Sequence, residues 1–301
     1  MSLVTPSTED CAPAKLNLYL HMVGRRADGY HLLESLVAFT RSGDGLSAVP
    51  AGALSLQIDG PFAASLRETP DDDNLVLKAA RSLAAWAGAH HRPVAGAALR
   101  LSKHLPVASG IGGGSADAAA ALNVLKRLWA LPIEEDALAA LAQKLGADIP
   151  ACVAGRPALM EGIGERLTAV PPLPPVPVLL VNPGLPLPTP SVYRAFRENF
   201  AIQPLPRAKP VGPWRDAKAL VAALATTQND LEAPALAICP AIGTVLAALT
   251  QSGALFARMS GSGATCFAIY GAAAAAAAAA VRLKAAEPSW WVMATALRGA
   301  A

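Results

Sequence analysis

The chain has 301 residues, of which 53% are hydrophobic, and this supplies enough apolar surface for the cores of two domains of ordinary size. Charged residues make up 16%, below the roughly 25% of an average globular protein, and alanine fills much of the difference, as a helix-rich enzyme allows. The net charge of +3 is mild, and no basic stripe is interleaved with aromatic residues. These properties argue against nucleic-acid binding.

Membrane insertion and secretion are also disfavoured. No run reaches the roughly 18 uninterrupted apolar residues of a spanning helix, because the alanine run at 272–280 is soon followed by Arg282 and Lys284. The N-terminus lacks the basic-then-apolar order of a secretory signal. The four cysteines lie far apart and form no C-x-x-C pair, so neither a zinc site nor a disulfide framework is predicted. We therefore expect a cytoplasmic protein without a membrane partner.

The first predicted elements alternate between strand and helix. Residues 54–58 and 98–101 alternate apolar with polar side chains, as half-buried strands do. Between them, residues 71–74 offer capping side chains and negative charge ahead of a helix over 75–86. A further helix over 134–145 opens with acidic residues and ends at Gly146.

A glycine-rich segment precedes a run of strong helix formers that extends from Ala116 to about Trp129. Without Cβ atoms the backbone can approach a ligand closely, and the unpaired N–H groups of the first helical turn can hold an anion such as a triphosphate. The alternative is a flexible surface turn. The residues predicted to contact phosphate are Pro106, Ser109, Gly110, Ile111, Gly112, Gly113, Gly114 and Ser115.

Two common nucleotide-binding patterns are missing. The segment lacks the G-x-x-x-x-G-K-[ST] spacing of a P-loop, and no G-x-G-x-x-G follows a strand. A second glycine cluster at 260–264 precedes a predicted strand, so it could present N–H groups to a ligand or serve only as a hairpin turn. P-loop ATPases and dinucleotide-dependent oxidoreductases are therefore disfavoured.

The sharpest change of composition lies between residues 171 and 190, where nine of twenty residues are proline. That density excludes helix and indicates a connection between two folding units, which we place at 1–168 and 169–301. The second unit is predicted to contain a strand at 265–270, a helix at 272–286 and a strand at 290–297. Helices and strands mix in both halves, so the predicted fold class is α+β.

Three ordered segments, 12–18, 106–120 and 259–264, together resemble the motifs of the GHMP kinases, the superfamily of galactokinase, homoserine kinase and mevalonate kinase. Within it, Gly24-Arg25-Arg26-Ala27-Asp28-Gly29-Tyr30-His31 resembles the G-x-R-x-D-G-Y-H segment of the diphosphocytidyl-methylerythritol kinases, and 146–150 and 188–190 are also similar to that family. The resemblance implies an N-terminal domain of mixed sheet and helices, a ferredoxin-like C-terminal domain, and an active site between them.

The resemblance also implies a reaction: transfer of phosphate from ATP, with Mg²⁺, to the 2-hydroxyl of a diphosphocytidyl sugar alcohol in the non-mevalonate isoprenoid pathway. Asp148 matches the catalytic base of the family, and Lys15 matches the lysine paired with it, which would offset charge on the transferred group. Without the resemblance, Lys15 reads as a solvated amine and Asp148 as a residue of a turn. Neither a metal-ligand set nor an oligomeric state is predicted.

Substrate and nucleotide contacts follow from the same match. Tyr30 is expected to stack on cytosine and His31 to hydrogen-bond the base edge. Asn74 and Lys103 match positions that line the adenine pocket. Further substrate contacts are expected from Asn17, Thr189, Pro190, Tyr193, Gly263 and Ala264.

One position departs from many relatives in the resembled family and a second from some of them, and two rival functions stay open. Ala116 replaces a second serine of the phosphate loop, and Val37 replaces a phenylalanine beside cytosine. The rivals are another GHMP-type kinase acting on homoserine, mevalonate or a sugar, and a regulator that binds nucleotide without catalysis. The first does not explain Tyr30 and His31, and the presence of both Lys15 and Asp148 argues against the second.

Overall fold

The structure is a computed structural model that describes residues 7–66, 70–202 and 207–299. The chain forms two compact units that interleave along the sequence. Unit 1 contains residues 1–14, 42–107 and 113–155, and unit 2 contains residues 15–41, 108–112 and 156–301. The two long strands β1 (Thr8–Arg25) and β2 (His31–Ala51) each contribute to both units, so no single cut of the chain separates them. The predicted boundary near residue 168 refers to the domains of the family and not to these units, so it stays a prediction.

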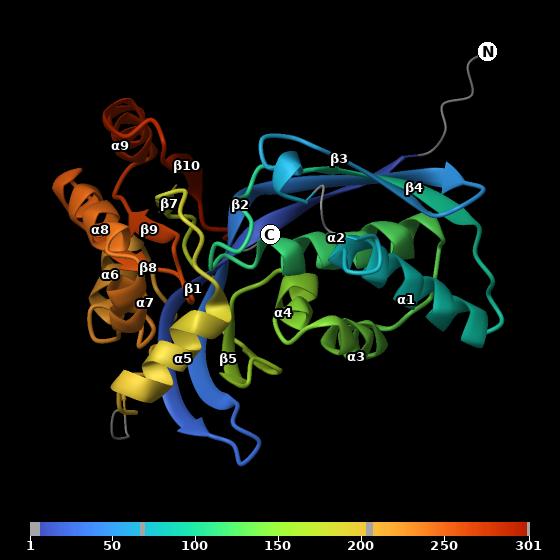
Figure 1. Cartoon of the computed structure of the whole chain (residues 1–301), viewed down its shortest axis with the longest axis horizontal. Helices are drawn as coiled ribbons and strands as arrows, with labels where there is room; N and C mark the ends of the chain where they lie inside the picture. Colours follow the sequence, from blue (N-terminus) through green and yellow to red (C-terminus); the bar gives the residue numbers. More distant parts are fainter. Residues whose placement is uncertain (1–6, 67–69, 203–206, 300–301) are drawn as a thin grey trace. The chain divides into compact units, whose positions relative to one another are not determined.

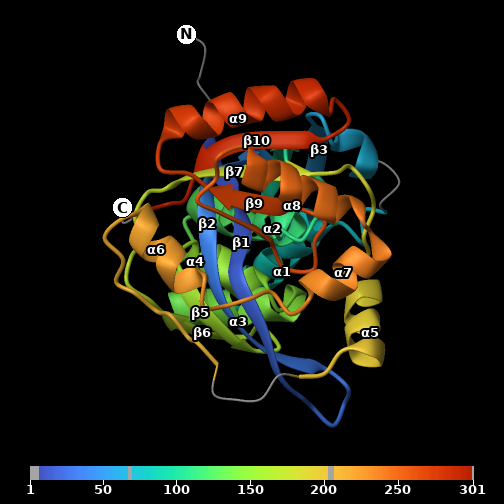
Figure 2. The ribbon, with the colours of Figure 1, turned by 90° about the vertical axis from the view of Figure 1, so that its left-hand side faces the viewer.

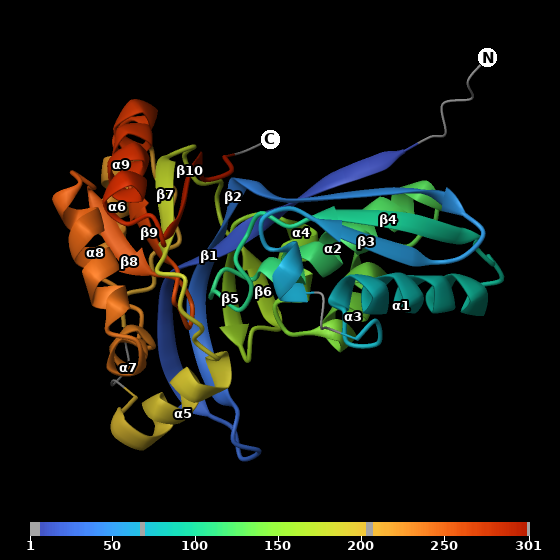
Figure 3. The same cartoon turned by 45° about the horizontal axis from the view of Figure 1, so that its top comes forward.

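Unit 1 combines a sheet with four helices. Its further elements are β3 (Ser55–Asp59), a 3₁₀ turn (Ala63–Leu66), α1 (Leu75–Ala89), β4 (Gly96–Ser102), α2 (Gly113–Leu128), α3 (Glu135–Leu145) and α4 (Ile149–Ala154). β4 pairs with β2 antiparallel and with β3 parallel. The parallel pair requires a crossover, which the 3₁₀ turn and α1 supply. The helices lie on one side of β3 and β4 (Figures 1 and 3).

The local sequence explains the helices of unit 1. Asn74 caps α1, because its side-chain oxygen accepts hydrogen bonds from the N–H groups of Val76 at 2.9 Å and Leu77 at 3.4 Å. Ala79 and Leu83 of α1 are fully buried, as the predicted apolar face requires. α3 ends at Gly146 as predicted. α2 begins at Gly113, three residues before the predicted start, so two of the loop's glycines lie in its first turn.

Unit 2 contains a four-stranded antiparallel sheet in the order β10-β7-β9-β8. Its strands are β7 (Pro177–Asn182), β8 (Phe256–Met259), β9 (Cys266–Ile269) and β10 (Trp291–Ala296), and α8 (Ala241–Gln251) and α9 (Ala273–Ala286) pack on it. Figure 2 shows α8 and α9 in front of β7, β9 and β10. The chain order β7-α8-β8-β9-α9-β10 is ferredoxin-like, which confirms that expectation.

The remaining elements of unit 2 include a hairpin and three helices. β5 (Ala158–Gly162) pairs with β2 and with β6 (Arg166–Ala169). The helices α5 (Thr189–Asn199), α6 (Ala217–Leu224) and α7 (Glu232–Ile238) lie between β7 and α8 in the sequence. Within the described residues no single helix is long and apolar enough to cross a membrane; only the pair α7 and α8, bent by 120°, reaches that length and composition together.

The proline-rich segment is more structured than the sequence predicts. The interpretation of residues 171–190 as a connection was wrong for β7, an inner strand of the sheet that starts at Pro177. Proline is tolerated at the first position of a strand. Helix α5 also begins inside this segment, at Thr189, with Pro190 in its first turn, where a missing N–H group costs no helical hydrogen bond.

Candidate active site

Backbone contacts within unit 2 hold the phosphate-loop residues 108–112 against the second glycine cluster. The hydroxyl of Ser260 donates to the carbonyl of Gly110 at 3.1 Å, and the N–H of Thr265 donates to the carbonyl of Ser109 at 3.1 Å. A Cβ atom on Gly110 would lie 2.6 Å from backbone atoms of Gly263 and Ser260. The two clusters therefore require glycine to approach this closely.

Lys15 lies beside the same loop segment. Its N–H donates to the carbonyl of Ile111 at 2.9 Å. A Cβ atom on Gly112, whose φ is +64°, would lie 3.2 Å from Cβ of Lys15 and 3.3 Å from its Cε. The side chain of Lys15 is 3% exposed, so it is not the solvated surface amine that the sequence leaves open.

Asn17 is fixed by the 260–264 loop and by β2. Its N–H donates to the hydroxyl of Ser260 at 3.1 Å, and its side-chain amide donates to the hydroxyl of Ser35 at 2.7 Å. A Cβ atom on Gly261 would lie 3.2 Å from the side-chain oxygen of Asn17. Ala264 is buried with the core of unit 2.

A cavity of about 680 Å³ in unit 2 gathers five of the predicted substrate-binding residues. Its lining residues are Arg25, Asp28, Gly29, Tyr30, His31, Leu33, Ile163, Thr189, Pro190, Tyr193, Arg194 and Arg197. Tyr30 is 62% exposed, whereas the ring of His31 lies 5.7 Å from that of Tyr193 and 5.6 Å from that of Phe196. An exposed aromatic residue and a partly buried polar ring in one cavity suit a nucleobase.

Charge in this cavity favours a neutral histidine. Burial lowers the pKa of His31, and the guanidinium groups of Arg25 and Arg197 lower it further. The arginines were not predicted from the sequence as lining residues. Arg194 and Arg197 lie three positions apart on α5, next to the predicted Thr189 to Tyr193 contacts, and the helical period was the signal that could have found them.

One hydrogen bond links this cavity to the glycine cluster. The hydroxyl of Thr189, at the start of α5, lies 2.8 Å from the hydroxyl of Ser262. Ser262 is 6% exposed and belongs to the loop that contacts Gly110. Within unit 2, the side chains of Thr189 and Ser262 therefore connect the predicted cytosine pocket to the 260–264 loop. That loop contacts the phosphate-loop segment 108–112 beside Lys15. Ser262 was not among the contacts predicted from the sequence.

A smaller cavity of about 200 Å³ in unit 1 contains both predicted adenine-pocket residues. Its lining residues are Leu66, Asp73, Asn74, Leu75, Val76, Leu101, Lys103, Val107, Gly114 and Asp117. The ammonium group of Lys103 lies 2.5 Å from an Asp44 carboxylate oxygen and 2.7 Å from an Asp117 carboxylate oxygen. Asn74 and Lys103 thus lie next to the start of α2, although Asn74 also has the structural role of capping α1.

Asp148 lies in unit 1 immediately before α4. Its backbone is helical, with φ −84° and ψ −16°, its side chain makes no capping hydrogen bond to α4, and Pro150 lies in the first turn.

Among the described residues no group of three His, Cys, Asp or Glu side chains is arranged to hold a metal ion, and the four cysteines form no disulfide there.

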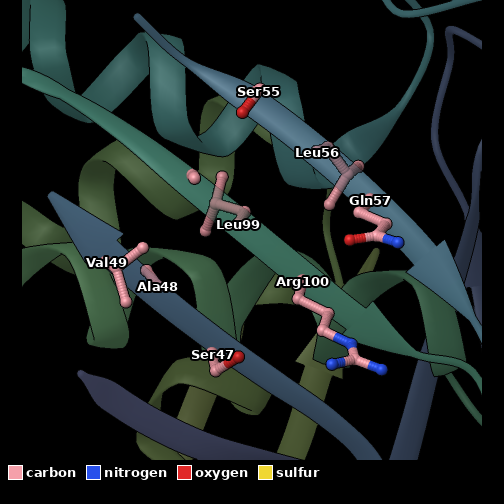
Figure 4. Close-up of a pocket in the computed structure, with 9 residues that line it drawn as sticks. Ser47, Ala48, Val49, Ser55, Leu56, Gln57, Leu99 and Arg100 are labelled. Carbon is pink, nitrogen blue, oxygen red and sulfur yellow. The ribbon is translucent and has the colours of Figure 1, made fainter. Parts of the chain in front are cut away.

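A third depression lies on the sheet of unit 1 and contains none of the predicted site residues. It has a volume of about 390 Å³ and is lined by residues of β2, β3 and β4. Figure 4 shows the side chain of Arg100 between Gln57 and Ser47. Arg100 is engaged by Asp59, 2.6 Å away, so this depression is not assigned to the active site.

Comparison with known proteins identifies the family. The GHMP kinases N terminal domain matches residues 74–156, and the GHMP kinases C terminal domain matches residues 211–287. The chain is 52% identical over 93% of its length to 4-diphosphocytidyl-2-C-methyl-D-erythritol kinase of Paramagnetospirillum magneticum, covering 95% of that protein. It is 51% identical over 95% of its length to the kinase of the same name from Cereibacter sphaeroides, covering 97% of it.

A solved structure agrees with this match. The crystal structure of a 4-(cytidine 5'-diphospho)-2C-methyl-D-erythritol kinase is similar with a TM-score of 0.75 and 35% sequence identity, covering 97% of this chain and 100% of that one. The sequence identity, the fold and the two matched domains therefore agree with the same family over nearly the whole chain. The chain belongs to the 4-diphosphocytidyl-2-C-methyl-D-erythritol kinase family of GHMP kinases.

Proposed function

We propose that this protein transfers the γ-phosphoryl group of ATP to the 2-hydroxyl of 4-diphosphocytidyl-2-C-methyl-D-erythritol, a step of the non-mevalonate isoprenoid pathway. The observation that carries the proposal is the identity of about 50% with kinases of that name over more than nine-tenths of the chain. The rival activities on homoserine, mevalonate or sugars do not account for this identity or for the aromatic cavity of unit 2.

The cytidine diphosphate group is assigned to the cavity of about 680 Å³. The exposed ring of Tyr30 is available to stack on cytosine, and Tyr193 supplies a second ring near His31. A neutral His31 keeps one ring nitrogen as an acceptor, which can pair with the amino group of cytosine. The guanidinium groups of Arg25, Arg194 and Arg197 give this cavity a positive rim that suits the phosphates.

The triphosphate of ATP is assigned to the glycine segment and the start of α2. The N–H groups of Gly113, Gly114 and Ser115 open the helix and have no partner in a preceding turn, so they and the helix dipole favour an anion. Asn74 and Lys103 line the neighbouring cavity proposed for adenine. Magnesium is proposed to enter with ATP as the substrate complex and to neutralise phosphate charge there.

Phosphoryl transfer needs a base for the hydroxyl and a cation for the transferred group. We assign the base to Asp148, because it matches the catalytic base of the family and lies immediately before α4. Positioned bases of this kind contribute about 10² to 10⁴-fold. Lys15 is proposed to stabilise charge on the transferred group, and its contact with Gly112 supports this role because Gly112 belongs to the phosphate segment.

The test is an ATP-consumption assay run in parallel with four acceptors: the diphosphocytidyl alcohol, homoserine, mevalonate and galactose. Turnover with the diphosphocytidyl alcohol alone is expected. Turnover with one of the other three would replace the proposed substrate, and binding of ATP without turnover of any acceptor would favour the non-catalytic regulator.

A further inference from the structure

Beneath the first turn of α2, unit 1 buries a cluster of three charged side chains. Lys103 lies between Asp44 and Asp117, and all three side chains are at most 4% exposed. The second oxygen of Asp44 accepts the N–H groups of His104 at 2.5 Å and Leu105 at 2.8 Å. Both carboxylate oxygens of Asp44 therefore have hydrogen-bond partners.

The charges of this cluster do not balance. One ammonium faces two carboxylates, so the fully ionised cluster carries 1 − 2 = −1. Among the described residues, the second oxygen of Asp117 is buried without a hydrogen-bond partner. Burial, together with the negative charge of Asp44, raises the pKa of Asp117 to about 7, against the opposing effect of Lys103.

The helices packed against α2 supply no compensating charge, and Asp10 of β1 pairs with Arg127 in the last turn of α2, away from the cluster. In α1, Lys78 and Arg81 form ion pairs with Asp73 and Asp72 at the surface. Helix α4 contains no charged residue. Asp117 therefore interacts with Lys103 and Asp44, and the cluster is neutral only when it holds one additional proton.

The cluster also lies close to the proposed phosphate site. A Cβ atom on Gly113, the first residue of α2, would be 3.2 Å from the ammonium nitrogen of Lys103. Asp117 is the fifth residue of this helix, about 6 Å along its axis from Gly113 at 1.5 Å per residue. A polyphosphate bound at the first turn would thus face a buried site whose net charge depends on one proton.

We propose that the Asp44–Lys103–Asp117 cluster takes up a proton when a nucleotide polyphosphate binds at the start of α2, so that nucleotide binding is proton-linked. The inference rests on the proposed function, because it assumes that the phosphates of ATP occupy this helix terminus. The added negative charge disfavours the ionised form of Asp117, so the bound protein holds the proton to higher pH than the unbound protein does.

The protonated cluster binds the anionic nucleotide more tightly than the deprotonated cluster does. The affinity of the protein for ATP therefore falls as pH rises through 7. A Coulomb interaction across about 8 Å shifts the pKa of Asp117 by about one unit, which gives uptake of about half a proton at pH 7.5. The dissociation constant for ATP then rises about sixfold between pH 6.5 and 8.5.

The experiment is isothermal titration calorimetry of magnesium-saturated ATP into the full chain, at pH 7.5, in buffers of different ionisation enthalpy. The wild type should take up about half a proton, and Asp117→Asn should take up none and bind with a dissociation constant independent of pH. Asp72→Asn is the matched control, because it removes an exposed carboxylate of the same unit that does not line the cavity, and its proton uptake should equal that of the wild type.

The outcomes separate the two proposals. Failure of ATP to bind at all would overturn the nucleotide site itself. ATP binding without proton uptake by the wild type, or with equal uptake by Asp117→Asn, would overturn the linkage alone. If Asp117→Asn does not fold, carboxyl ¹³C resonances of the wild type decide: a carboxyl that titrates near pH 7 must move to higher pH when ATP is added.

Discussion

The hydroxyl groups of Thr189 and Ser262 lie 2.8 Å apart and join the first turn of α5 to the loop that contacts Gly110. This contact belongs neither to a helix nor to a sheet ladder. It fixes a residue that lines the proposed cytidine cavity relative to the glycine cluster beside the phosphate segment. Its effect on substrate binding can be measured separately from the effect on ATP.

Removing either hydroxyl should weaken binding of the diphosphocytidyl substrate. We expect Thr189→Val and Ser262→Ala each to raise the KM for that substrate by about fivefold, the value of one ordinary hydrogen bond, with little change in the KM for ATP. The double variant should be no worse than either single one, because both remove the same contact.

Ser252→Ala is the matched control for the Thr189→Val and Ser262→Ala variants. It removes a hydroxyl that lies 2.5 Å from the hydroxyl of Tyr270, elsewhere in unit 2. Its KM for the diphosphocytidyl substrate should equal that of the wild type. Full additivity of the Thr189 and Ser262 effects would show that the two hydroxyls act independently.

Loss of the Tyr30 ring should affect the cytidine substrate alone. Base stacking on an aromatic ring is worth about 1 to 3 kcal/mol, so Tyr30→Ala should raise the KM for the diphosphocytidyl substrate by about 10 to 100-fold. Since the side chain is 62% exposed, the free energy of unfolding should change by less than about 0.5 kcal/mol. Tyr30→Phe should retain the wild-type KM, and equal effects of Tyr30→Ala on both substrates would contradict the stacking role.

Asp148→Asn should abolish most turnover while leaving nucleotide binding intact. We expect kcat to fall by about 10² to 10⁴-fold, because the amide cannot accept the substrate proton. The dissociation constant for ATP, measured by calorimetry, should change little. Asp136→Asn, in the first turn of α3, is the control, since it removes an exposed carboxylate of the same unit. Near-normal turnover of Asp148→Asn would rule out its role as base.

The buried Lys103 should be essential for the stability of unit 1. Lys103→Met leaves Asp44 and Asp117 facing each other without a cation, which should lower the free energy of unfolding by about 3 to 5 kcal/mol. Lys78→Met removes an exposed lysine from its ion pair with Asp73, and the change there should stay within about 0.5 kcal/mol. Denaturant unfolding measures both, and equal effects would contradict this account.

Acid should destabilise unit 2 through His21. Burial, followed by the charge of Arg207, lowers the pKa of His21 to about 4. Between the ordinary value of 6.5 and 4, the unfolded chain binds a proton that the folded protein excludes, so the free energy of unfolding falls as pH falls, by up to about 3 kcal/mol.

The measurement is denaturant unfolding at pH 7 and at pH 4.5 for three proteins. His21→Gln should lose this part of the pH dependence, because glutamine does not titrate. His90→Gln removes an exposed histidine of unit 1 and should keep the wild-type dependence. The same loss of stability in His21→Gln as in the wild type would assign the acid sensitivity to other groups.

Local signals in the sequence predicted several elements well. Helix α1 has an asparagine cap and an apolar face, and α3 ends at a glycine, so neither depends on distant residues. The long strand β1 was not predicted, although residues 14–22 alternate apolar side chains with Lys15, Asn17, Tyr19 and His21. The uninterrupted burial of residues 12–22 on both faces was not predictable from this alternation, because it follows from contacts with segments far away in the chain.

Only the site residues that belong to recognisable motifs could be predicted from the sequence. Lys15 and Asp148 were found through the resemblance, and the contact of Lys15 with Gly112 spans 97 positions of sequence, a separation that no periodicity encodes. The Asp44–Lys103–Asp117 cluster was missed as a unit, because its members are 59 and 14 residues apart and belong to three different segments. Long side chains such as those of Arg194 and Arg197 join a cavity only once the helix is in place.

The contact between the two glycine clusters limits how this protein can be evolved in the laboratory. A methyl group on Gly110 would collide with main-chain atoms of Gly263 and Ser260, and one on Gly261 would lie 2.8 Å from the carbonyl oxygen of Gly110. Because the obstacles are main-chain atoms, no second-site change of side chain can make room for that methyl group. A combinatorial library randomised at positions 110 and 261 should therefore return glycine at both, whatever residues are selected at the neighbouring positions.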